Sequence, residues 1–258
     1  MLKTGIYVDA ENIRMCGGYG MRYDVLIDLG STNDSVVLRA NSYLAEDRKR
    51  TQEDQEYRQK LYNYHNIIRR CGFKLIKKFV SRYVDDEGVV TTKANADMDL
   101  AIDALLQSRN LDRIILLTGD GDFVRLITAL QNKGCRVEVI GFKNVSNDLR
   151  ESADTFLSGF LVPGLLPING SGGGEEIWYR GTPVNYNQER KFGFMRYFRL
   201  TREKLIPESV FFHRSKAQVE SDQVFLNPNG IFEFRIAPNP LNENRPEAWE
   251  VRPLPEHD

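Results

Sequence analysis

The first two thirds of the chain alternate short apolar runs with segments in which apolar residues recur every three to four positions. Short runs bounded by turn residues are typical of buried strands, whereas the longer spacing is typical of helices. The expected strands are 5–9, 35–44, 73–84, 113–117 and 136–142, and the expected helices are 23–29, 51–71, 97–108 and 121–132. This alternation predicts an α/β domain with a mostly parallel sheet.

The pattern changes near residue 163. Residues 162–176 contain two prolines and the run Asn169-Gly-Ser-Gly-Gly-Gly174, a composition that holds neither a helix nor a central strand. Beyond it, short strands with alternating aromatic residues are expected at 191–199, 209–212 and 230–236. We therefore predict a first domain, a flexible linker and an all-β barrel, at residues 1–163, 164–176 and 177–258.

Composition excludes several classes of protein. With 258 residues, 41% hydrophobic and 28% charged, the chain can bury one large or two modest cores. No run approaches the roughly 18 apolar residues of a membrane span, and the chain does not begin with the apolar region of a signal peptide. We expect a cytoplasmic protein without a membrane partner. Three distant cysteines and three histidines lack zinc-ligand spacing, so disulfides and structural zinc are not expected.

Charge is segregated along the chain, although the net charge is only −1. Residues 66–84 contain six basic residues and no acid, and residues 180–216 contain nine basic residues against three acids. Two positive regions of this kind suit the binding of a polyanion. Either region alone could equally be an ordinary solvated surface.

Acidic residues stand where the apolar runs stop. Asp9 ends the first strand, Asp120 and Asp122 follow the strand 113–117, and Asp97 opens a helix. In an open parallel sheet the carboxyl ends of the strands line one crevice, so acids that are distant in sequence can meet there. Each acid also has a simpler explanation, because Asp is common at helix N-termini and in turns.

The residues around these acids favour a hard divalent cation. Asn12 faces the same crevice across a tight turn, and glycines beside Asp120 let the backbone approach a ligand. Crowded carboxylates repel one another unless a cation is bound. Oxygen ligands without Cys or His select Mg²⁺ or Mn²⁺. Arg125, one turn into the next helix, could contact a phosphate or form an exposed ion pair.

Three acids of the helix 97–108 cannot all point inward. Asp99 and Asp103 share one face, and Asp97 lies about 200° from Asp99 around the helix. Asp97 aligns instead with the apolar stripe that packs on the sheet, so we place Asp97 in the site. Asp99 is a weaker candidate for a second metal ion, and Asp103 is expected to be structural.

Together these motifs resemble the NYN domain of the PIN-like nuclease superfamily over residues 3–160. The resemblance is carried by Tyr7-Val-Asp9-Ala-Glu-Asn12, Asp97-Met-Asp99-Leu-Ala-Ile-Asp103 and Leu117-Thr-Gly-Asp120-Gly-Asp122-Phe. It implies a Rossmann-like PIN fold and metal-dependent endoribonuclease chemistry, with a catalytic site formed by Asp9, Asn12, Asp97, Asp120 and Asp122. Lys93-Ala-Asn-Ala-Asp97 departs from the usual Lys-Gly-Val-Asp by displacing the lysine one residue.

The second domain presents alternating aromatic residues next to positive charge. Stacking rings flanked by basic groups are what single-stranded nucleic acid needs, although the same rings could instead fill a small barrel. The segment resembles a cold-shock domain, an OB-type barrel, in Gly181-Thr182, Lys191-Phe-Gly-Phe-Met195, Val210-Phe-Phe-His213 and Val251-Arg-Pro-Leu254. Asn185 and Lys191 depart from that family. The nucleic-acid-binding residues expected here are Arg190, Lys191, Phe192, Phe194, Phe211 and His213.

The sequence therefore predicts an endoribonuclease that uses Mg²⁺ or Mn²⁺, with Asp9, Asp97, Asp120 and Asp122 as metal ligands. A barrel that binds single-stranded RNA would raise the local RNA concentration at the cut site. Two alternatives stay open: a non-catalytic RNA-binding regulator that uses both domains, and a phosphatase acting on small phosphoesters. The sequence leaves the RNA target and the formation of an oligomer open.

Overall fold

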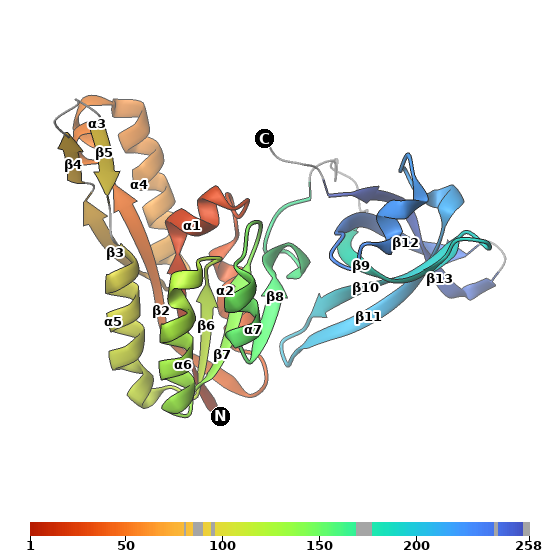
Figure 1. The fold of residues 1–258 in the computed structure, drawn as a ribbon, viewed down its shortest axis with the longest axis horizontal. Helices are drawn as coiled ribbons and strands as arrows, with labels where there is room; N and C mark the ends of the chain where they lie inside the picture. The colour runs from red at the N-terminus through yellow and green to blue at the C-terminus, as the bar shows by residue number, and fades with distance from the viewer. Residues whose placement is uncertain (80, 85–89, 94–95, 169–176, 240–241, 255–258) are drawn as a thin grey trace. The chain divides into compact units, whose positions relative to one another are not determined.

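A computed structural model describes residues 1–79, 81–84, 90–93, 96–168, 177–239 and 242–254. The chain forms two compact units, Met1–Ser158 and Gly159–Asp258 (Figure 1). Within the part of the chain that the structure describes, no helix has both the length and the hydrophobicity to cross a membrane.

The first unit is built on a six-stranded sheet with the strand order β3-β2-β1-β6-β7-β8. Its strands are β1 (Leu2–Asp9), β2 (Ser35–Glu46), β3 (Lys74–Phe79), β6 (Arg113–Leu117), β7 (Arg136–Gly141) and β8 (Thr155–Ser158). All neighbouring strands are parallel, which confirms the predicted α/β class. A separate antiparallel pair consists of β4 (Ser81–Val84) and β5 (Val90–Lys93).

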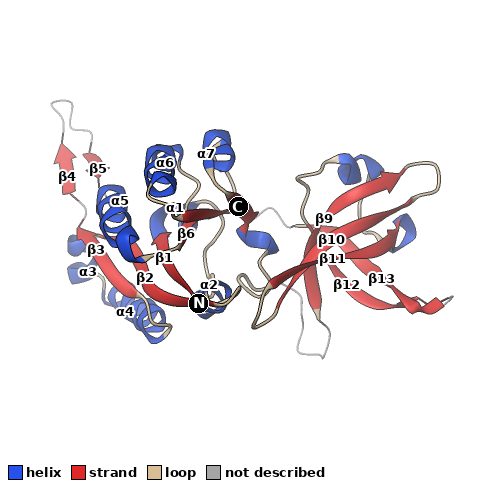
Figure 2. Cartoon of the chain, turned by 90° about the horizontal axis from the view of Figure 1, so that it is seen from below, coloured by secondary structure: helices blue, strands red, loops and turns tan. Residues whose placement is uncertain are grey.

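Helices cover both faces of the sheet, as a parallel sheet requires. They are α1 (Ala10–Met15), α2 (Tyr23–Gly30), α3 (Arg48–Glu53), α4 (Gln55–Arg70), α5 (Ala96–Gln107), α6 (Val124–Asn132) and α7 (Asn147–Ser152). Helices α5, α6 and α7 lie on one face, and α2 and α4 lie on the other (Figure 2). The central strands are consequently buried on both sides, and every residue of β6 is buried.

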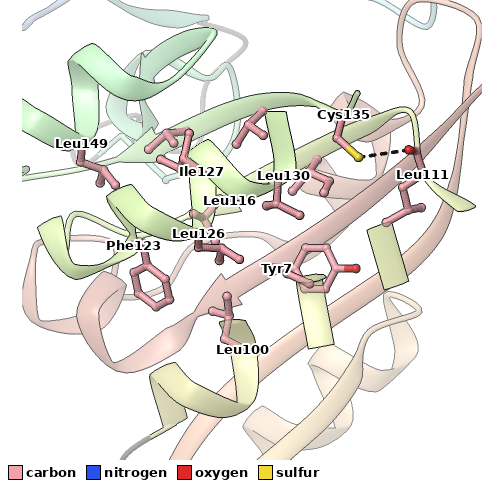
Figure 3. Packing of buried hydrophobic residues seen from close by; sticks show 14 of the residues in the cluster. Tyr7, Leu100, Leu111, Leu116, Phe123, Leu126, Ile127, Leu130, Cys135 and Leu149 are labelled. Carbon is pink, nitrogen blue, oxygen red and sulfur yellow. Dashed lines mark hydrogen bonds between the residues drawn. The ribbon is translucent and has the colours of Figure 1, made fainter. Parts of the chain in front are cut away.

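The main core lies between the sheet and the helices α5, α6 and α7 (Figure 3). Leu100 of α5 and Leu130 of α6 are fully buried there with Tyr7 and Leu116 of the central strands. Beside them, the thiol of Cys135 donates a hydrogen bond to the carbonyl oxygen of Leu111 at 3.3 Å. This packing fixes α5, which carries Asp97, against the middle of the sheet.

Two predicted elements are wrong in their extent. The expected helix 51–71 is divided into α3 and α4, because Asp54 has an extended backbone and its carboxylate accepts from the Tyr57 amide at 2.9 Å. An aspartate that caps the second helix in this way interrupts the first. The expected strand 73–84 is likewise two strands, β3 in the main sheet and β4 in the small one.

The second unit is a closed five-stranded β-barrel, as predicted. Its strands are β9 (Trp178–Asn187), β10 (Phe192–Leu200), β11 (Leu205–His213), β12 (Phe232–Asn239) and β13 (Asn242–Pro253), in the order β10-β11-β13-β12-β9. Phe212, Phe234 and Met195 are fully buried inside it. This architecture is consistent with an OB-type barrel.

The segment that precedes the barrel is partly described. Leu165 and Leu166 are buried, and the guanidinium of Arg180 donates to the carbonyl oxygens of Leu166 at 3.1 Å and Pro167 at 2.8 Å. The predicted linker 164–176 begins within this segment. Its remaining residues, 169–176, lie outside the described residues, so the flexible linker stays a prediction.

We predict that Leu100→Ala destabilises the first unit by about 2 to 5 kcal/mol, because it removes a fully buried side chain and leaves a cavity. Ile102→Ala is the matched control on the same helix. Ile102 is 49% exposed, so its replacement is expected to change the free energy of unfolding by less than about 1 kcal/mol. Urea unfolding followed by circular dichroism measures both values, and equal losses would contradict the packing described.

Candidate functional site

The order in which the chain adds strands to the sheet reverses between β1 and β6. The chain moves outward from β1 through β2 to β3, and then from β6 through β7 to β8 on the other side. In doubly wound sheets the crevice at such a reversal, beyond the carboxyl ends of the strands, is where ligands bind. Asp9 is the last residue of β1, and Thr118 directly follows β6. Both residues therefore lie at this crevice.

Asp9 is held in place by two hydrogen bonds. Its Oδ1 accepts from the backbone amide of Asn12 at 3.1 Å, and its Oδ2 accepts from the hydroxyl of Thr118 at 3.2 Å. Asp9 thus caps α1, as an ordinary structural aspartate does, and also reaches across to the end of β6. Only 4% of Asp9 is exposed. Burial raises its pKa to about 6, and the nearby Asp97 and Asp120 add to this rise, although the two hydrogen bonds oppose it.

Asn12 ties the first turn of α1 to the loop after β6. Its side-chain oxygen accepts from the backbone amide of Gly119 at 2.8 Å. The structure therefore gives Asn12 a bracing role at the crevice, next to the predicted catalytic acids.

Asp120 and Asp122 occupy the loop that follows β6. The Oδ1 of Asp120 accepts from the backbone amide of Asp122 at 3.0 Å and caps the short 3₁₀ turn Gly121–Phe123. Asp120 is half-buried and Asp122 is exposed. A Cβ atom at Gly121 would lie 2.9 Å from the hydroxyl of Ser146, so the loop is packed closely on its neighbour.

Asp97 lies in the first turn of α5, on the predicted side of the helix. Leu100 and Ala104 are fully buried in the core, with Ala101 and Leu105 packed against it. Burial raises the pKa of Asp97, and the charges of Asp120 and Asp122 raise it further. Asp97 also raises the pKa of Asp9. The structure consequently brings acids from three separate segments into mutual electrostatic contact.

The other two acids of α5 are engaged elsewhere. Asp99 forms an ion pair with Lys78 at 3.0 Å, and Asp103 accepts from the hydroxyl of Tyr43 at 2.9 Å. Asp103 thus has the structural role that was expected. The ion pair directs Asp99 toward β3.

The acids at the crevice offer carboxylate oxygens, which are the ligands that hard divalent cations prefer. The charges of Asp97 and Asp120 raise the pKa of Asp9, and that of Asp120 raises the pKa of Asp97, which is a repulsion that a bound cation would relieve. Among the described residues, no group of three or more His, Cys, Asp or Glu side chains is arranged to hold a metal ion. The acids thus lie at one crevice but do not form a metal site in this arrangement.

Sequence patterns gave no role to Thr118 or Cys16. Thr118 is fully buried, and its hydroxyl donates to Asp9 and accepts from the Asp120 amide at 3.2 Å. Thr118 lies between the end of β6 and Gly119, and this position in the sequence could have indicated that Thr118 lies at the crevice. The thiol of Cys16 has a pKa raised by burial and by Asp9 and Asp120, which places it near the acids. No local motif in the sequence indicates that Cys16 lies near the acids.

Arg125, which the sequence offered as a phosphate contact or an exposed ion pair, is exposed on α6.

Aromatic side chains gather on the outer face of the barrel, on β10 and β11. Phe192 lies opposite His213, and Phe194 lies opposite Phe211. The ring of Phe211 is 5.5 Å from that of Phe192 and 5.8 Å from that of Phe194, between centroids. The intervening pair, Gly193 and Phe212, is buried. The four predicted stacking residues thus share one face, which we call the barrel platform.

The two predicted basic residues lie at the β9–β10 turn. Lys191 has a positive φ of 57°, and its ammonium pairs with Asp222 at 2.7 Å. Arg190 is exposed, and its backbone amide donates to the side chain of Asn187 at 2.8 Å. Arg190 therefore offers its charge to solvent, whereas that of Lys191 is engaged within the barrel.

Fold and crevice together define a doubly wound α/β domain with acidic residues at its crevice. The family model described as "NYN domain" matches residues 3–166, which is more than half of the 258 residues. The chain therefore belongs to the NYN domain family, and its first unit is a nuclease-type domain of the PIN-like superfamily.

Two individual proteins are similar to this chain. "Low amplitude and bright protein LabA" of Synechococcus elongatus is 26% identical over 126 residues, 48% of this chain and 65% of that relative. The chain thus matches less than two thirds of the length of that relative. A crystal structure of a protein of unknown function from Vibrio parahaemolyticus has 27% identity and a TM-score of 0.49, covering 61% of this chain and 92% of that one.

We predict that Asp9→Asn changes the pH dependence of stability in chelator. Because the pKa of Asp9 rises from 3.8 to about 6, the folded chain binds this proton more tightly than the unfolded chain does. That contribution, at most about 3 kcal/mol, is present below about pH 4 and is lost as the pH rises to about 6. Asp9→Asn removes the decline, and above pH 6 the variant is expected to melt higher than the unmodified chain.

Thermal unfolding in EDTA between pH 4 and 7 tests this expectation. Asp28→Asn is the control, since Asp28 is exposed on α2. The control should keep the decline of the unmodified chain. Parallel profiles for Asp9→Asn and the unmodified chain would show that Asp9 does not have a raised pKa.

Proposed function

We propose that this protein is a metal-dependent endoribonuclease that hydrolyses RNA phosphodiester bonds and binds single-stranded RNA through its barrel. The observation that carries the proposal is the meeting of Asp9, Asp97 and Asp120 at the crevice of an NYN domain. Carboxylates that repel one another lower the stability of a fold. A group of them in such a crevice is therefore characteristic of a functional site.

Asp9, Asp97, Asp120 and Asp122 would hold Mg²⁺ or Mn²⁺. A bound ion of this kind lowers the pKa of a water molecule and stabilises the negative charge on the leaving oxygen. Thr118 fixes the orientation of the Asp9 carboxylate, and Asn12 fixes the loop that carries Asp120. With a pKa of about 6, Asp9 is mostly ionised at neutral pH and is ready to act as a ligand.

The barrel platform would stack bases of the same RNA. Phe194 is 39% exposed, and its neighbours Phe192, Phe211 and His213 are half-buried, so their faces are partly open to solvent. Arg190 would contact phosphates, and Lys191 would do so on exchanging Asp222 for a phosphate. Tethering the two units raises the concentration of RNA at the crevice without any new contact.

We expect Asp9→Asn and Asp120→Asn each to lower divalent-dependent RNA cleavage by about a hundredfold or more, since even outer-shell changes at metal sites cost about 10- to 100-fold. Denaturing gels of labelled RNA and DNA oligonucleotides, with Mn²⁺, Mg²⁺ or EDTA, measure the rate and the preferred substrate. Asp28→Asn should cleave normally. Undiminished cleavage by both crevice variants would refute the proposed site.

The same experiment separates the two alternatives. A non-catalytic RNA-binding regulator would hold RNA in EDTA and never shorten it when metal is added. A phosphatase would hydrolyse p-nitrophenyl phosphate and leave internal bonds of oligonucleotides intact.

We predict that Phe194→Ala combined with Phe211→Ala weakens the binding of single-stranded RNA by about fivefold to 150-fold for each stacked base lost, since one stack contributes about 1 to 3 kcal/mol. Fluorescence anisotropy in EDTA measures the affinity. Leu226→Ala is the control, because Leu226 is 51% exposed outside the platform. An unchanged affinity would show that the rings serve only the barrel.

A further inference from the structure

Two arginine side chains of α3 lie over aromatic rings. The guanidinium of Arg48 lies 3.5 Å from the ring centre of Phe79, and that of Arg50 lies 4.3 Å from the ring centre of Tyr57. Both arginines are exposed, and Phe79 is 40% exposed. We call these four residues the α3 ridge. None of them belongs to the acidic crevice or to the barrel platform.

The α3 ridge lies at the same end of the sheet as the crevice. Asp9 is level with Tyr43 of β2, whereas Phe79 is level with Glu46, three residues further along β2. Two strand spacings across and three residues along the sheet amount to about 10 Å each, so Asp9 and Phe79 are about 14 Å apart. Figure 1 shows α3 beyond the tip of β2, and β1 runs parallel to β2.

One contact connects the strand of the ridge with a helix that carries an acid of the crevice. Lys78, next to Phe79, pairs with Asp99, which is two residues after Asp97. This ion pair joins the end of β3 to the first turn of α5.

The chemistry of the ridge suits bases better than phosphates. The charge of Arg50 is balanced by Asp54 at 3.9 Å, and that of neighbouring Lys49 by Glu53 at 3.9 Å. The net positive charge around the ridge is thus small, and it attracts phosphate groups only weakly. An exposed guanidinium that lies over a ring is held in place on one side and open to solvent on the other, and unpaired bases stack on guanidinium planes as they do on aromatic rings. Bases within a duplex are already stacked and cannot do so.

We propose that the α3 ridge is a base-stacking site for single-stranded RNA whose scissile phosphate lies at the acidic crevice. This rests on the proposed function. Arg48 on Phe79 and Arg50 on Tyr57 each receive one base, a few nucleotides from the cut. The nuclease domain then selects unpaired RNA by itself, and substrates too short to reach α3 are cleaved less efficiently.

The test compares arginine with lysine, which keeps the charge and loses the stacking plane. The full chain carries Arg48→Lys with Arg50→Lys, in a background of Phe194→Ala and Phe211→Ala that removes binding by the barrel platform. Affinity is measured in EDTA for a single-stranded oligonucleotide and for a duplex of the same sequence. We expect single-strand binding to fall about fivefold or more and duplex binding to stay unchanged.

Arg58→Lys is the matched control. Arg58 is exposed on α4 and stacks on no ring among the described residues. The control should bind as its parent does. Phe79→Leu, which keeps an apolar side chain and removes the ring, should reproduce about half of the loss on a logarithmic scale.

Unchanged single-strand affinity in the lysine variant and in Phe79→Leu would overturn the proposal, as would an equal loss on duplex RNA or an equal loss in Arg58→Lys. Because binding in EDTA does not require cleavage, the result is independent of whether Asp120→Asn abolishes activity. The proposals for the α3 ridge and for the nuclease site can therefore be refuted separately.

Discussion

The structure depends on the adjacency of β1 and β6, which are far apart in the sequence and parallel in the sheet. Their shared register brings Asp9 and Thr118 to the same edge, where one hydrogen bond joins them and a second, from Gly119 to Asn12, joins the loops that follow. Everything proposed for the crevice follows from this junction. A different neighbour for β1 would separate the acids, whatever their local sequences.

The crevice has an energetic cost that the core offsets. Buried Asp9 would be more stable protonated, and its neighbours add repulsion. Tyr7 of β1 and Leu116 of β6, both fully buried just before the crevice, hold the two strand ends in place against this repulsion. Stability is thus concentrated in the middle of the sheet, and charge is concentrated at its edge, which is the usual division between scaffold and site in doubly wound domains.

Much of the fold could be predicted because buried central strands are continuous apolar runs, as 113–117 shows. Helical periodicity alone separates Asp97 from Asp99, and the residues that align with Asp97, Leu100 and Ala104, are buried as predicted. Other features depend on tertiary context. The division at Asp54 requires a capping geometry, and the pairing of Asp99 with Lys78 requires that β3 lie beside α5. Likewise, nothing in the sequence places Arg48 on Phe79, because the partners are separated by a whole helix.

The family match and the structural division end at different residues. The match extends to residue 166, but residues from Gly159 onward belong to the compact unit of the barrel, where Arg180 holds the carbonyl groups of Leu166 and Pro167. Excising the barrel at the end of the family match would thus remove the Leu166 carbonyl from a guanidinium that is 7% exposed and also paired with Glu233. Gene fusions that exchange this barrel are therefore expected to include the segment from Gly159 onward.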